Sequence, residues 1–234
     1  MTKFHYEDIR CPHCLNEEKI PVWDIVDISE DADLKEKIML KELQTFECQN
    51  CNHFYVLDKP FLYIDPEQEL MIFYAAKFKD ALLKPEARND KGELKELIRK
   101  NLPLDFGVNV EDFTLRIVSD YNSLIEKMHV FDYELNDFII EVLKLSVKIN
   151  PPKIVDEKGN QTVRQISLIY FVGIEDDKFV FQTYSDDQVW RQILLEPSVY
   201  KQAQAMLKNK LPEGKSWELV DELGASIYLN NFPI

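Results

Sequence analysis

Short apolar runs, interrupted by charged and cysteine-containing segments, mark the first 77 residues of the chain. These runs predict β-strands over residues 20–28, 45–57 and 70–77. A charged segment between the first two runs predicts a short helix over residues 31–41. We therefore expect residues 1–77 to form a β module of their own.

The hydrophobic period becomes helical within residues 78–150. After a predicted strand over residues 113–118, two segments place apolar residues at the spacing of an amphipathic helix. The apolar positions are Tyr121, Leu124, Ile125, Met128 and Phe131 in the first segment, and Leu135, Phe138, Ile139, Val142, Leu145 and Ile149 in the second. Pro151 and Pro152 must end the second helix, because proline disfavours helical geometry in the residue before it. We place a domain boundary there.

Strand and helix signals alternate in residues 151–234. Apolar runs over residues 166–172 and 179–184 predict a hairpin, and residues 197–207 predict a helix. Residues 217–229 predict a closing strand segment. This part of the chain is therefore expected to be an α+β domain.

Composition narrows the class of protein. A chain of 234 residues that is 45% hydrophobic can bury a substantial core. No stretch approaches the roughly 18 uncharged apolar residues of a membrane span, and the first residues lack an apolar leader, so we predict a cytoplasmic protein. The 6 glycines form no phosphate-binding loop, and neither a GxSxG elbow nor an HExxH helix occurs. Nothing in the sequence indicates an active site.

The charge is strongly acidic. The net charge is -14, and residues 1–75 alone contain 7 basic and 16 acidic residues. Such a field repels phosphate backbones and anionic lipids. Residues 1–75 also lack the stripe of interleaved basic and aromatic residues that is typical of nucleic-acid-binding surfaces. We expect neither nucleic acid nor a membrane as a partner.

All four cysteines fall into two CxxC pairs, and this is the strongest chemical signal in the chain. Cys11 and Cys14 form the first pair, Cys48 and Cys51 form the second, and 33 residues separate the pairs. A CxxC turn aims two thiolates at one ion, and two such turns complete the tetrahedral sulfur shell that Zn²⁺ prefers. We predict one structural Zn²⁺ per chain with these four ligands.

Two other uses of the cysteines stay open from the sequence. Cys11-Pro12-His13-Cys14 is also a redox tetrapeptide of thioredoxin-like enzymes, but there it opens a helix, whereas residues 15–21 are a poor helix that ends at proline. The redox interpretation also leaves the second CxxC without a role. A catalytic or regulatory metal would keep an open position, which four thiolates fill.

Histidines and acidic runs offer weaker candidates. His13 and His53 lie beside the cysteines, and we expect them to surround the site or to lie on the surface rather than to bind metal. The runs Glu175-Asp176-Asp177, Asp186-Asp187 and Asp65-Pro66-Glu67 are expected to be solvated turns.

Residues 9–76 resemble the CpXC domain of bacterial proteins. The matching features are Cys11-Pro12-His13-Cys14, Val22-Trp23-Asp24, the helix segment Leu34 to Ile38, Glu42 to Phe46 ahead of Cys48-Gln49-Asn50-Cys51, and Phe61 to Glu67. Residues 115–118, 124–127 and 138–141 resemble the helical part of longer members. The resemblance implies a four-cysteine zinc module of unassigned activity. Leu15 and Asn52 depart from it, because members usually carry glycine after each CxxC.

Together these signals predict an α+β protein in three parts. The parts are a zinc-ribbon-like β module (1–77), a mixed segment ending in two amphipathic helices (78–150), and a C-terminal α+β domain (151–234). We expect a protein-interaction module whose ribbon is a rigid platform for a protein partner. The alternative is an enzyme whose site, between the ribbon and the C-terminal domain, uses residues scattered in sequence. The sequence specifies neither the partner nor the oligomeric state.

Overall fold

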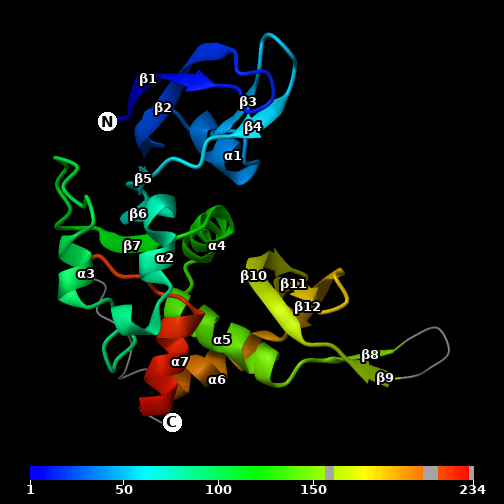
Figure 1. Ribbon diagram of the computed structural model, residues 1–234. Coiled ribbons are helices and arrows are strands. Elements are labelled where there is room, and N and C mark those ends of the chain that lie inside the picture. The colour runs from blue at the N-terminus through cyan, green and yellow to red at the C-terminus, as the bar shows by residue number, and fades with distance from the viewer. Residues whose placement is uncertain (156–160, 208–215, 232–234) are drawn as a thin grey trace. The chain divides into compact units, whose positions relative to one another are not determined.

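Figure 1 shows the computed structural model, which describes residues 1–155, 161–207 and 216–231. The fold is α+β, as the sequence predicts. The strands are β1 (Lys3–Arg10), β2 (Glu17–Asp27), β3 (Thr45–Glu47), β4 (Phe54–Val56), β5 (Phe61–Asp65), β6 (Leu70–Tyr74), β7 (Thr114–Val118), β8 (Lys153–Val155), β9 (Gln161–Val163), β10 (Ile166–Glu175), β11 (Lys178–Ser185) and β12 (Trp190–Leu195). The helices are α1 (Asp33–Met39), α2 (Lys79–Leu82), α3 (Glu96–Lys100), α4 (Tyr121–Asp132), α5 (Asp137–Ile149), α6 (Pro197–Leu207) and α7 (Glu222–Asn231), with short 3-10 turns η1 (Ala76–Phe78) and η2 (Pro85–Ala87).

The chain forms two compact units, and each draws on segments that are distant in sequence. Unit 1 consists of Met1–Ala87, Leu94–Ile125 and the described residues of Gly214–Leu219. Unit 2 consists of the remaining described residues, which include Arg88–Glu93. The three-part division along the sequence stays a prediction.

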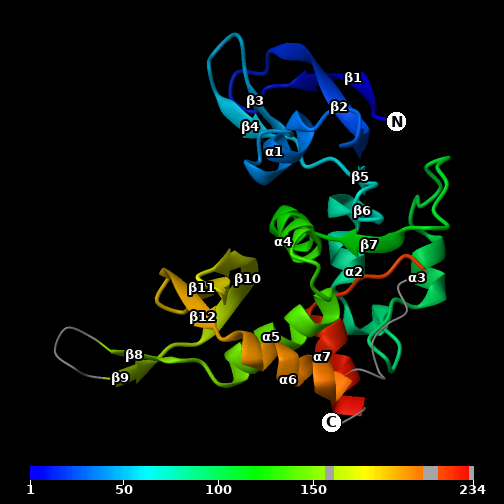
Figure 2. The same cartoon turned by 180° about the vertical axis from the view of Figure 1, so that it is seen from behind.

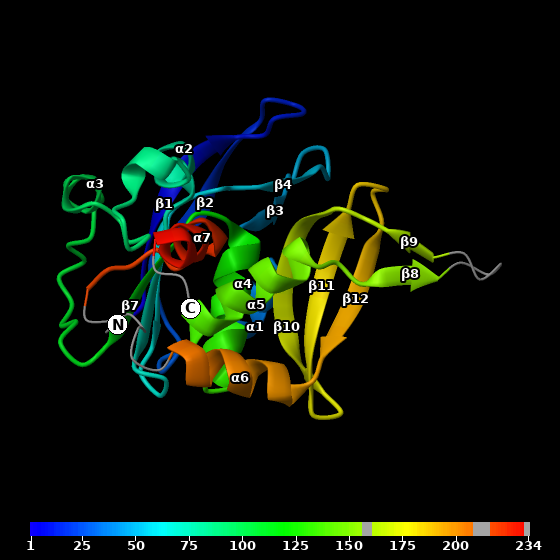
Figure 3. The ribbon, with the colours of Figure 1, turned by 90° about the horizontal axis from the view of Figure 1, so that it is seen from below.

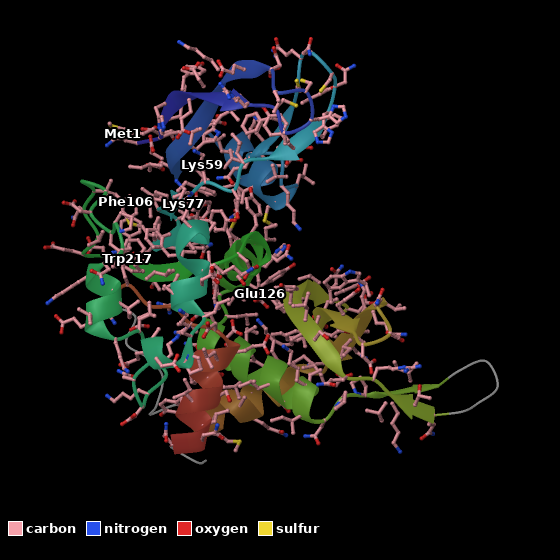
Figure 4. The ribbon with its side chains drawn as sticks, viewed as in Figure 1. Met1, Lys59, Lys77, Phe106, Glu126 and Trp217 are labelled. Atoms are coloured by element: carbon pink, nitrogen blue, oxygen red, sulfur yellow. The ribbon has the colours of Figure 1, made fainter. Side chains whose placement is uncertain are left out.

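A five-stranded mixed sheet organises unit 1. Its order is β1-β2-β5-β6-β7, with β2 and β5 parallel, β6 and β7 parallel, and the other two neighbouring pairs antiparallel. Every residue of β5 and β6 is buried, as expected for near-continuous apolar strands at the centre of a sheet. Phe106 and Trp217, labelled in Figure 4, add to this core with ring centroids 5.9 Å apart.

The core of unit 2 lies between a three-stranded sheet and helices. The sheet has the order β10-β11-β12, and Figure 3 shows its strands alongside α5. Phe171 and Phe181 are fully buried in the same cluster as Ile139 and Leu143 of α5. The predicted hairpin, the predicted helix over residues 197–207 and the end of the second amphipathic helix before Pro151 are all confirmed.

Three elements differ from the sequence prediction. The run over residues 45–57 is not one strand but the antiparallel hairpin of β3 and β4, because the second CxxC turn interrupts it. Residues 3–10 form β1, which their weak apolar pattern did not indicate, because this edge strand has one exposed and one half-buried face and contains no fully buried residue. The predicted strand over residues 217–229 is wrong in its second half, where α7 begins at Glu222. Asp221 caps that helix by accepting a hydrogen bond from the Gly224 N–H at 2.8 Å. Only the part around Glu218 is extended, bridging in parallel to Arg116.

A network of buried charges joins α4 to α5 in unit 2. Lys127 Nζ lies 2.9 Å from Glu141 Oε1, and Lys144 Nζ lies 2.8 Å from both Glu126 Oε2 and Glu141 Oε2. The Phe171 N–H donates to Glu126 Oε1 at 2.6 Å, which ties the network to β10. Burial raises the pKa of Glu126 to about 7, whereas the carboxylates around Lys144 outweigh the opposing effect of burial and raise its pKa.

We predict that Lys144→Met destabilises unit 2 by about 3–5 kcal/mol, because it leaves buried carboxylates without their cation. Lys148→Met on the same helix is the matched control, since its pair with Glu222, 2.6 Å apart, is partly exposed. That control should cost no more than about 1 kcal/mol. Hydrogen exchange of the α5 amides under increasing urea measures both. Equal losses would contradict a special role for the buried network.

Candidate metal centre

Two hairpin turns carry the four cysteines. Cys11 directly follows β1 and Cys14 lies in the turn before β2, while Cys48 directly follows β3 and Cys51 lies in the turn before β4. Figure 2 shows the two hairpins, coloured blue and cyan, in the N-terminal part of unit 1. The ladders β1–β2 and β3–β4 are antiparallel, so each CxxC sits where its hairpin reverses direction.

The four sulfur atoms gather at one point. All lie within 4.8 Å of one another, and the Sγ atoms of Cys14 and Cys48 are 3.6 Å apart while those of Cys11 and Cys51 are 3.8 Å apart. A tetrahedron with metal–sulfur distances of about 2.3 Å has edges of about 3.8 Å. The sulfur positions therefore fit one tetrahedral ion.

The two turns share one backbone conformation. The Leu15 N–H donates to the Cys11 carbonyl at 3.0 Å, and the Asn52 N–H donates to the Cys48 carbonyl at 2.8 Å. Leu15 and Asn52 then take left-handed conformations, with φ of 62° and 55°. Glycine takes this conformation without strain and asparagine takes it at low cost, whereas leucine is strained in it.

Apolar packing shields one side of the site. Cys11 and Cys48 are buried in a small cluster with Ile20 and Tyr55, which come from β2 and β4. Cys14 and Cys51 are partly exposed. The centre is thus closed on the side of the hairpins and borders solvent on the other.

Hydrogen bonds and burial push the thiol pKa values in opposite directions. Asn50 Nδ2 donates to Cys14 Sγ at 3.5 Å, and this bond contributes most to lowering the pKa of Cys14 to about 6. Burial raises the pKa of Cys48 to about 12, and it also raises the pKa of Cys51. A cation is therefore needed to hold all four as thiolates near neutral pH.

Two polar neighbours of the site escaped the sequence analysis. Glu18 Oε1 accepts from Cys48 Sγ at 3.2 Å and from the Gln49 N–H at 3.0 Å, and Asn50 bonds Cys14 as described. Glu18 pairs with Ile9 in the β1–β2 ladder. Only this register, which no motif encodes, brings its carboxylate to the second hairpin.

The histidines lie at the surface, as predicted. The rings of His13 and His53 stack with centroids 5.2 Å apart and an interplanar angle of 21°. Both residues are exposed, and neither belongs to the four-cysteine group, which is the only such group of potential ligands within the described residues.

The acidic runs make structural contacts. Asp176 and Asp177 form the turn between β10 and β11, with φ of 48° and 62°. Asp187 forms an ion pair with Arg191 at 2.6 Å. Asp65 ends β5 as a buried residue and accepts from Tyr63 Oη at 3.1 Å, so it is not a solvated turn residue as predicted.

Local structure also bears on the redox interpretation. The first CxxC is followed by strand β2 and not by a helix, so no helix N-terminus stabilises a reactive thiolate there. The four cysteines also lie in one cluster, which gives the second CxxC the same role as the first.

Comparison with known proteins identifies one relationship. A family model described as "CpXC protein" matches residues 9–144, which is more than half of the chain and includes both CxxC pairs. No curated protein and no solved structure matches the chain. Within the described residues, no helix is long and apolar enough to cross a membrane.

Leu15→Gly should strengthen metal binding, because glycine removes the strain of the left-handed conformation. The gain is about 0.5–1 kcal/mol after the added freedom of the unfolded chain, or roughly a two- to fivefold rise in affinity. Asn52→Gly is the control and should change the affinity less. Competition with a chelator measures both, and equal gains would show that Leu15 is not strained.

Binding of Zn²⁺ at pH 7 should release at least about two protons per ion, because Cys48 and Cys51 are protonated in the free chain and must lose their protons to bind. The affinity should therefore rise with pH, by about two orders of magnitude from pH 6 to pH 7. Calorimetry in two buffers of different ionisation enthalpy counts the protons. Release of less than one proton would contradict these pKa directions.

Proposed function

The chain belongs to the CpXC family, and from that premise we propose that its four cysteines bind one structural Zn²⁺ and that the module so formed binds a protein partner. The sulfur geometry supports the first part of this proposal. Four sulfur atoms at the spacing of a tetrahedral shell leave the ion no open position for a water or a substrate. The ion then acts on folding and not on chemistry.

Size explains why such a module needs an ion. The cluster around the site contains few apolar side chains, Ile20 and Tyr55 being its buried members besides the cysteines Cys11 and Cys48. A core this small offsets little conformational entropy, whereas a structural Zn²⁺ supplies about 10 kcal/mol or more. Metal binding and ordering of the two hairpins are therefore coupled.

Exposed apolar side chains support the interaction part of the proposal. On β1, Phe4 and Tyr6 are 48% and 63% exposed, and on β4, Phe54 and Val56 are both 64% exposed. Each hairpin thus presents large apolar residues to solvent, which is typical of a surface that another protein covers. The acidic charge of residues 1–75 argues against nucleic acid or an anionic membrane as the partner.

We predict one Zn²⁺ per chain in protein purified without added metal, and its loss in Cys48→Ser. Removing one ligand forfeits most of the binding energy that orders both hairpins. Hydrogen exchange of Cys48→Ser should therefore show lost protection over β1 to β4 and retained protection in α5, β10 and β11, which have their own apolar core.

His53→Ala is the matched control, because this residue lies beside the sulfur cluster without belonging to it. It should keep one Zn²⁺ and normal exchange. Loss of metal in His53→Ala would make a histidine a ligand, and absence of metal from the unaltered chain would end the proposal of a structural zinc. Uniform loss of protection in Cys48→Ser would mean that the hairpins and unit 2 unfold as one.

A further inference from the structure

Strand β1 ends the sheet of unit 1 and has a neighbour on one side only. It pairs with β2 along its whole length, and no other strand within the described residues pairs with it. An edge strand presents unpaired N–H and C=O groups, which are a template for one more strand. At eight residues, β1 is long for an exposed edge.

The phase of the ladder identifies the backbone groups that face outward. The Cys11 N–H donates to the Asn16 carbonyl at 2.9 Å, directly beyond the pair of Arg10 with Glu17. In an antiparallel ladder only alternate residues exchange hydrogen bonds with the partner strand. Cys11 is bonded to the partner strand, so Ile9, Glu7 and His5 also face β2. The N–H and C=O groups of Tyr6, Asp8 and Arg10 therefore point away from β2.

An aromatic stripe lies along the same edge. Phe4 faces Trp23 across the ladder with ring centroids 5.2 Å apart, and Tyr6 lies 5.7 Å from Phe4. Phe4 and Tyr6 are about half exposed or more, at 48% and 63%. Side chains of an added strand would lie directly beside this stripe.

The apolar surface continues from the edge strand into a shallow groove. Pro21, which pairs with Tyr6, and Trp23 both line this groove. Its other side is formed by residues of the α1–β3 connection, β3 and the segment after β4: Leu43, Gln44, Phe46, Leu57 and Lys59. Gln44 Nε2 donates to the Lys59 carbonyl at 2.6 Å and holds the wall in place; Lys59 is labelled in Figure 4. The patch is therefore wider than the single strand.

Charge specifies what fits on this surface. Strands β1 and β2 together contain six carboxylates and three lysine or arginine residues. Arg10 is paired with Glu17 at 2.7 Å and Asp24 with His5 at 2.8 Å, whereas Asp8 is an exposed carboxylate on the same face as Phe4 and Tyr6. A second copy of this chain would bring a like charge of -14 to an acidic edge. A cationic occupant is favoured instead.

We propose that β1 binds an extended, basic segment of a partner protein, which adds to the sheet as a sixth strand. The inference rests on the proposed function and names its surface and the class of its ligand. Phe4, Tyr6 and Asp8 lie on one face of β1, because side chains alternate along a strand. Aliphatic residues of the segment cover Phe4 and Tyr6, and a lysine or arginine at the next position of the same face approaches Asp8. Backbone bonds to Tyr6, Asp8 and Arg10 set the register.

The probe for this proposal is an eight-residue capped peptide that has, on one face, valine or leucine opposite Phe4 and Tyr6 and lysine or arginine opposite Asp8, and has lysine or arginine on the other face. We expect it to bind the zinc-loaded full chain and to slow amide exchange at Tyr6, Asp8 and Arg10. A peptide with two central prolines lacks ladder donors, and one with glutamate in place of the basic residues has the wrong charge. Both should bind at least about tenfold more weakly.

Two variants with matched controls test the surface. Phe4→Ser combined with Tyr6→Ser should weaken binding about tenfold, while Phe54→Ser, an equally exposed aromatic on the other hairpin, should not. Asp8→Lys should weaken binding about three- to tenfold. Asp112→Lys makes the same charge change beside β7 at the opposite edge of the sheet and should have no effect. Asp8→Lys keeps the test decisive if the double variant does not fold.

Several results would overturn the inference: equal binding of the proline peptide, exchange protection outside β1, or an effect of Phe54→Ser in place of Phe4 and Tyr6. The inference would also be overturned if the chain formed concentration-dependent dimers in which the β1 amides are protected from exchange without peptide, because a second copy would then occupy this edge. If the chain holds one Zn²⁺ but does not bind the peptide, this inference fails and the proposed structural zinc stands. If the chain holds no Zn²⁺, the proposed function itself fails.

Discussion

Convergence of four sulfur atoms is the constraint on which the N-terminal part of the structure depends. Two antiparallel hairpins that share few apolar contacts are held together where their turns meet, at sulfur separations of 3.6 and 3.8 Å. Because buried thiols such as Cys48 resist ionisation, the same arrangement is costly without a cation and favourable with one. If the site binds a metal ion as proposed, the cohesion of the two hairpins depends on that ion and on pH.

Unit 2 is held together by an apolar core and by buried ion pairs. Its aromatic core, which includes Phe171 and Phe181, is large enough to need no ion. The charges buried beside it are paired: Lys127 and Lys144 lie within hydrogen-bonding distance of Glu126 and Glu141. Such pairs contribute little net stability but penalise any arrangement that separates them. The network thus favours a single way of packing α4 against α5.

The exposed edge of the sheet lies next to the four-cysteine site. β1 leads directly into the first cysteine, and Glu18, which contacts Cys48, stands opposite Ile9 of β1. The first CxxC turn and the edge strand β1 thus belong to one hairpin, and ordering one of them orders the other. A partner that adds a strand to β1 would bind better when the metal is in place, because the hairpin is then already ordered.

The features that could be predicted from the sequence are those that depend on residues close together in the chain. The CxxC pairs indicated the cluster of four cysteines, helical periodicity located α4 and α5, and Pro151 marked the end of the second of these helices. Each of these signals acts within a few residues, so it is visible in a single sequence. The family could also be recognised from its ordered motifs.

Tertiary structure decided the features that depend on partners distant in sequence. The register of β1 on β2 brings Glu18 to Cys48, and the cap from Asp221 turns residues after 221 into α7 where apolar runs had predicted a strand. β1 contains no fully buried residue, so only its pairing with β2 reveals it as a strand. Pairing across a ladder and packing of noncontiguous segments into two units have no local signature, because the interactions that favour them form only after the chain has folded.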